Sequence, residues 1–72
     1  MKTFIRNREG LYFRADGNWT DSREAAKDFR TSALAIWESR ISNLKSVEIV
    51  LVSDAGPAAE EVLVFPLHDP HF

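Results

Sequence analysis

The sequence predicts an α+β domain, in the order β-β-α-α-β-β, in which two helices cover one face of a four-stranded, mainly antiparallel sheet. Three observations predict this fold class. Residues 2–14 contain two short aromatic and aliphatic runs separated by a turn, as in a β-hairpin. Residues 33–44 repeat apolar side chains at three- and four-residue steps, as in an amphipathic helix. Two β-branched runs follow, and helices segregated from strands along the chain are typical of the α+β class.

Length and composition fit one small domain. The chain has 72 residues, of which 44% are hydrophobic and 28% are charged. We expect a single domain over residues 1–67 and a flexible tail over residues 68–72. A folded chain of this size buries only about 60% of the surface that its unfolded form exposes. The core is therefore small, and stabilisation by an oligomeric partner is one expectation.

The hairpin over residues 2–14 is predicted from two runs that flank a turn. The first run is Phe4-Ile5 and the second is Leu11-Tyr12-Phe13, whose side chains alternate between two faces. Gly10 ends the turn between them, where it can adopt a positive φ angle. A second turn is predicted at Asp16-Gly17-Asn18.

A short first helix is predicted from Ser22 to about Phe29. Asp21 and Glu24 have the spacing of a capping box, in which two side chains bond the free N–H groups of the first turn. We interpret Trp19, which precedes the cap, as a residue that packs onto this helix.

A longer second helix is predicted to follow a cap at Thr31 or Ser32 and to end near Asn43, a residue that tolerates the left-handed conformation. We expect Trp37 to lie in the core, because it falls on the apolar stripe. The apolar positions of this helix are Ala33, Leu34, Ile36, Trp37, Ile41 and Leu44.

Two strands are predicted at Val47–Val52 and Glu61–Phe65, and Pro66 ends the second one. Both strands are apolar on both faces, although two helices can cover only one face of a sheet. An uncovered apolar face of this kind predicts an interface with a second copy of the chain or with another protein. Two alternatives stay open: the tail or the loop over residues 54–60 covers that face, or β-branched residues are tolerated there. The predicted interface residues are Val50, Val52, Val62 and Val64.

Charge is distributed unevenly along the chain. The net charge is −2, yet the first fourteen residues carry an excess of bases, and residues 46–72 carry five acids and no lysine or arginine. The basic hairpin offers an alternative function, binding of a nucleic acid or another anionic ligand, with aromatic rings for bases and guanidinium groups for phosphates. The small number of bases and the acidic strands of the same sheet argue against it. The residues of this alternative site are Arg6, Arg8, Tyr12 and Arg14.

No set of residues predicts catalysis, a cofactor or a metal site. His68 and His71 flank Asp69 in the predicted tail, but there is no cysteine or third histidine to complete a metal site. Neither a nucleophile elbow nor a phosphate-binding loop is present. The N-terminal residues do not read as a signal peptide, and no apolar stretch has the length of a membrane span. We therefore expect a cytoplasmic protein that is not an enzyme and has no membrane contact.

One pattern resembles a known group of sequences. The opening Gly10-Leu11-Tyr12-Phe13, followed by Gly17-Asn18-Trp19-Thr20, Glu24-Ala25 and Phe29, resembles that of short bacterial and phage-type proteins without a known activity. The resemblance covers most of residues 4–52 and implies no catalytic residue, cofactor or ligand. The expected function is a small interaction module that forms a homodimer through the second sheet face.

Overall fold

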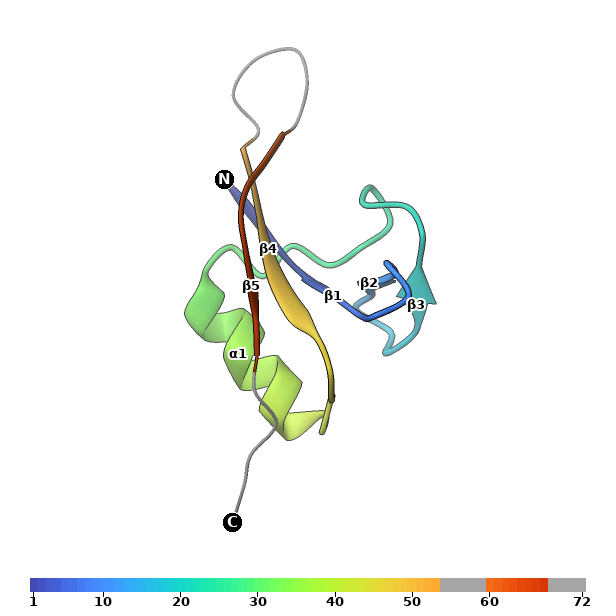
Figure 1. Cartoon of the computed structure of the whole chain (residues 1–72). Helices are drawn as coiled ribbons and strands as arrows, with labels where there is room; N and C mark the ends of the chain where they lie inside the picture. The colour runs from blue at the N-terminus through green and yellow to red at the C-terminus, as the bar shows by residue number, and fades with distance from the viewer. Residues whose placement is uncertain (54–59, 68–72) are drawn as a thin grey trace.

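The computed structural model describes residues 1–53 and 60–67, and it shows a small α+β protein with a five-stranded antiparallel sheet and one helix (Figure 1). The strand order is β3-β2-β1-β4-β5, so β1 lies in the centre of the sheet. The α+β class is thus confirmed, whereas the prediction of four strands and two helices is wrong. The elements are β1 Lys2–Arg6, β2 Tyr12–Phe13, β3 Trp19–Thr20, α1 Ser32–Ile41, β4 Glu48–Ser53 and β5 Glu60–Pro66.

The N-terminal hairpin is present, but its second strand is short. β1 pairs with β4 along its whole length and with β2 only at Arg6, which lies opposite Tyr12. Gly10 and Gly17 adopt φ angles of 83° and 87° in the turns on either side of β2, where a side chain would be strained. Trp19 lies in β3, with its ring edge-on to Phe13, and does not precede a helix. The fifth strand therefore comes from the residues interpreted as the approach to the first helix.

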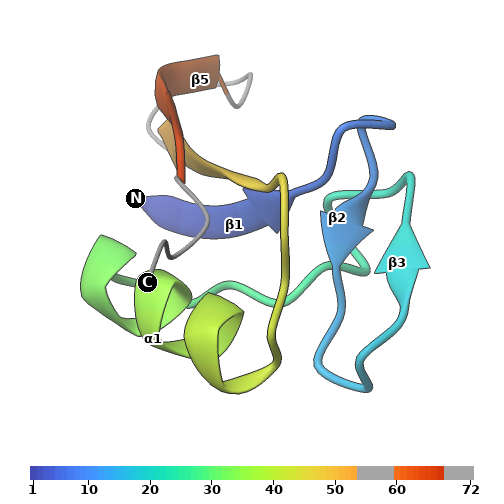
Figure 2. The ribbon, with the colours of Figure 1, turned by 60° about the horizontal axis from the view of Figure 1, so that its bottom comes forward.

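The predicted first helix is replaced by turns and an extended stretch. The Thr20 hydroxyl accepts the Ser22 N–H, so Thr20 takes the capping role that the sequence predicts for Asp21. The chain then follows the part of β1 that β2 leaves unpaired, where the Phe29 N–H donates to the Thr3 carbonyl (Figure 2). This arrangement satisfies main-chain groups of β1 that would otherwise be buried without a partner.

The stretch between β3 and α1 also contributes to the second face of the sheet, which the sequence predicts to be open. Ala26 packs there on a cluster of four buried side chains, Phe4, Tyr12, Val50 and Val52. The opposite face packs on α1 and forms the larger cluster of Ile5, Phe13, Phe29, Ala35, Val47 and Ile49. Val50 and Val52 are therefore buried within the chain's own fold, and Ala26, from the segment predicted as a helix on the first face, packs on the second.

Helix α1 packs on the sheet through small residues. Thr31 caps it by accepting the Leu34 N–H at 3.2 Å, and Asn43 follows it at a φ angle of 53°, both as the sequence predicts. Its buried residues are Ala35 and Ser39, which allow the helix to lie close to the sheet. Trp37 points away from the sheet and is 64% exposed, so its assignment to the core is wrong.

We predict that Phe29→Ala costs about 3–5 kcal/mol of unfolding free energy, because it opens a cavity in the larger cluster. Trp37→Ala should cost less than about 1 kcal/mol, since the ring has few contacts to lose. Urea denaturation followed by circular dichroism gives both values. Equal losses in the two variants would place Trp37 in the core after all.

A second prediction concerns Asp28, whose Oδ1 accepts the N–H groups of Thr3 and Arg30 at 3.0 and 2.9 Å. Asp28→Ala should destabilise the fold by about 1–3 kcal/mol, because it leaves the N–H of buried Thr3 without a partner. Asp21→Ala is the matched control and should change stability by less than about 0.5 kcal/mol. The reverse ranking in thermal melts would support the capping box predicted at Asp21.

Candidate functional site

Arg6 joins four strands at one end of the sheet. Its Nε donates to Glu48 Oε1 at 2.6 Å, and its Nη1 donates to Glu61 Oε1 at 2.5 Å. The same Nη1 lies 3.4 Å from the Tyr12 hydroxyl, and the guanidinium carbon lies 5.9 Å from the centre of the Tyr12 ring. One side chain of β1 therefore contacts β2, β4 and β5 together.

The charged form of Arg6 is stabilised by its neighbours. Burial disfavours the charged form, but the hydrogen bonds to Glu48, Tyr12 and Glu61 outweigh this effect and raise the pKa of Arg6 above its ordinary value. The positive charge of Arg6 is thus stabilised by Glu48 and Glu61, two carboxylates of its own chain.

This geometry argues against the nucleic-acid site predicted in the N-terminal hairpin. Tyr12 is buried, so its ring has no free face on which a base can stack. Arg14 is exposed and pairs with Asp16 at 3.3 Å on the turn after β2. Of the four predicted residues, the structure brings only Arg6 and Tyr12 into contact, and it uses both internally.

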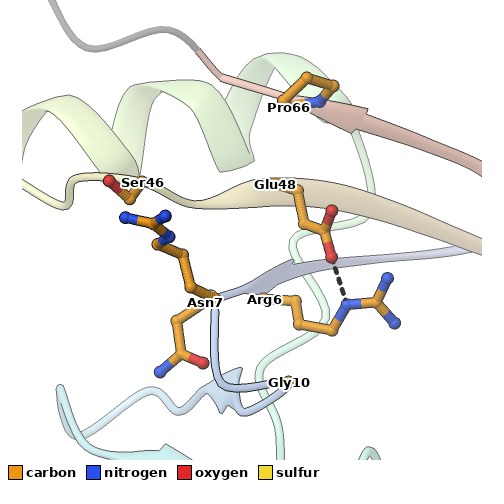
Figure 3. Close-up of a pocket in the computed structure, with 7 residues that line it drawn as sticks. Arg6, Asn7, Gly10, Ser46, Glu48 and Pro66 are labelled. Carbon is orange, nitrogen blue, oxygen red and sulfur yellow. Dashed lines mark hydrogen bonds and ion pairs between the residues drawn. The ribbon is translucent and has the colours of Figure 1, made fainter.

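A pocket of about 580 Å³ lies beside Arg6, between the β1–β2 turn and the adjoining ends of β4 and β5 (Figure 3). Arg6 Nε and Glu48 Oε1, which both belong to lining residues, bond each other. No group of three metal-binding side chains occurs in the described part of the chain, and His68 and His71 lie outside it. The lining residues are Arg6, Asn7, Arg8, Gly10, Ser46, Glu48 and Pro66.

The predicted interface residues separate into two pairs. Val50 and Val52 are buried in one cluster with Phe4, on which Ala26 packs, whereas Val62 and Val64 are exposed on β5. A register shift in the β4–β5 pairing occurs at Leu51 and Val52, and Val62 has no partner in β4. Within residues 1–53 and 60–67, no strand pairs with the outer edge of β5.

Sequence reasoning missed two parts of the exposed apolar surface. Leu63 lies on the opposite face of β5 from Val64 and is about half exposed. On α1, Leu34, Trp37 and Ile41 form a stripe that faces solvent. Their spacing of three and four residues is visible in the sequence, but it reads equally well as a core-facing stripe. No helix of the described residues is long and apolar enough to cross a membrane.

We predict that Arg6→Leu destabilises the fold by about 1–3 kcal/mol, because it leaves Glu48 and Glu61 without their common partner. Arg8→Leu is the matched control: Arg8 lines the same pocket but is exposed, and its loss should cost less than about 0.5 kcal/mol. Urea midpoints of the two variants provide the measurement. Equal midpoints would show that the Arg6 contacts contribute nothing to stability.

Comparison of the chain with protein-family models, with curated proteins and with solved structures finds no match. The function must therefore be inferred from the exposed side chains and their chemistry.

Proposed function

We propose that this protein is a non-enzymatic interaction module that forms a homodimer by pairing β5 with β5 of a second copy. The observation that carries this proposal is the terminal position of β5, whose residues Val62, Leu63 and Val64 are all exposed. An edge strand with apolar side chains on both faces is a template for a further strand.

The main chain of β5 supports this pairing. The β4–β5 register places Val47 opposite Leu67, whose N–H donates to the Val47 carbonyl at 3.0 Å. Because main-chain groups alternate along an antiparallel strand, those of Phe65 point to β4 and those of Val64 point to the open edge. Pro66 also faces outward, so its missing N–H costs no bond to β4 and removes one donor only at the end of the open edge.

The sequence of β5 favours a second copy in antiparallel orientation. Pairing about Leu63 places Val62 of each copy opposite Val64 of the other. It also places Glu61 opposite Phe65, whereas parallel pairing would set the acidic ends side by side. Two-fold symmetry of this kind closes the assembly at a dimer. A chain with so small a core gains the additional buried surface that it needs.

Val62→Lys and Leu63→Lys should each weaken self-association at least about tenfold, since a desolvated charge would enter the contact. Sedimentation equilibrium from low to high micromolar concentration measures the dissociation constant, and circular dichroism verifies folding. Leu34→Lys is the matched control, because Leu34 is equally exposed but lies on α1. A wild-type protein that stays monomeric at high micromolar concentration would overturn the proposal, as would folded β5 variants that remain fully dimeric.

A further inference from the structure

Arg6 is connected to the β5 edge through Glu61, the acid next to the exposed apolar residues of that strand. Arg6 Nη1 donates to Glu61 Oε1 at 2.5 Å, although the two residues lie 55 positions apart in the chain. The side chain of Glu61 is 40% exposed, and Val62, which is also exposed, follows it directly. One ion pair thus joins the central strand to the terminal strand across β4.

The register shift in the β4–β5 pairing directs Glu61 to this ion pair. Without a shift, Glu61 would share a face with Leu63, which lies opposite Leu51. The shift between Leu51 and Val52 instead places Glu61 opposite Val52, whose side chain belongs to the cluster of the second face. Irregularities of this kind re-aim a side chain at the edge of a sheet. The carboxylate is therefore turned to the face on which it can bond Arg6.

In the β5–β5 dimer proposed above, Glu61 adjoins the apolar contact. Antiparallel pairing about Leu63 sets Val64 of the second copy opposite Val62, one residue from Glu61. A two-fold axis perpendicular to the sheet relates the strands of such a pair, so the second faces of the two copies are continuous. Val64 belongs to this face, because it pairs with the enclosed Val50. The second copy thus removes water from the surroundings of the Glu61 carboxylate.

Arg6 supplies the counter-ion that such a carboxylate needs. A charge that loses water without a counter-ion disfavours the state in which this happens, here the dimer. The guanidinium is already in place in the single chain, because its Nε bonds Glu48 at 2.6 Å and its Nη1 lies 3.4 Å from the Tyr12 hydroxyl. No rearrangement of Arg6 is therefore needed when two copies meet.

We propose that Arg6 controls self-association through β5, because it neutralises Glu61 beside the contact and holds its side chain on the second face. Arg6 is a positioning residue, since it acts through Glu61 and contacts no residue of the second copy. This inference rests on the proposed β5–β5 dimer and adds that its strength depends on a base of the central strand.

Arg6→Gln tests this role. Sedimentation equilibrium should give a dissociation constant raised about tenfold, because two-fold symmetry makes the loss of the counter-ion count twice. Arg8→Gln is the matched control: it removes the same charge from an exposed residue of the adjoining turn and should change the constant by less than about twofold. Equal dissociation constants for the two variants would overturn the proposal.

Glu61→Gln in the Arg6→Gln protein separates association from folding. Glutamine carries no charge, so the double variant should associate as strongly as Glu61→Gln alone. Its urea midpoint, measured at a concentration at which the protein is monomeric, should stay below that of Glu61→Gln, because Glu48 still lacks its partner. A dissociation constant that stays raised in the double variant would show that Arg6 acts only through the stability of the fold, which contradicts the assignment.

The wild-type protein distinguishes failure of this inference from failure of the dimer. A wild-type chain that stays monomeric at high micromolar concentration overturns both. A wild-type dimer that Val62→Lys weakens and Arg6→Gln leaves unchanged retains the β5 contact and overturns the role of Arg6 alone. A dimer that Arg6→Gln weakens and Val62→Lys leaves unchanged forms through another surface, and this result also overturns both.

Discussion

The fold depends on how the main-chain N–H and C=O groups at the open edge of β1 obtain hydrogen-bond partners. β2 reaches β1 at a single residue pair, so the N-terminal half of the central strand would expose main-chain groups inside the molecule. Phe29 and Asp28 close this edge by bonding the carbonyl and the N–H of Thr3. This stretch must be extended to form both bonds to Thr3, and it is therefore not a helix. The same two bonds constrain how the chain enters α1.

The same stretch determines which apolar residues are buried. Before it reaches Thr3 it places Ala26 on the cluster of the second face. It then brings Phe29 to the first face, where the ring is buried in the larger cluster. Helix α1 lies close to the sheet through Ala35 and Ser39, and Ile36 packs on the same cluster.

The sequence correctly predicts those features that depend on a few adjacent residues. The two glycine turns, the Thr31 cap, the end of α1 near Asn43 and the central apolar strand are all confirmed, since each depends on a few adjacent residues. The capping box at Asp21 satisfies an equally local rule, but bonding to β1 outweighs it. This bond joins residues 26 positions apart in the chain, and no local pattern contains it.

The candidate surfaces were predictable to different degrees, because burial also depends on contacts between residues far apart in the chain. An apolar residue in a strand shows that it can be buried, and only the path of the remaining chain decides whether it is. Val50 and Val64 are directly paired across β4 and β5, yet one is fully enclosed and the other is exposed. Likewise, the spacing of Leu34, Trp37 and Ile41 fits a buried stripe, yet the side of α1 that faces the sheet carries the small residues Ala35 and Ser39.

A single ten-residue helix also explains why two apolar surfaces remain in the described part of the chain. α1 lies against β1 and β4, and Phe65 of β5 packs on the cluster below it, but Val62, Leu63 and Val64 stay exposed. Its outer side has no further layer above it, which leaves Trp37 in solvent.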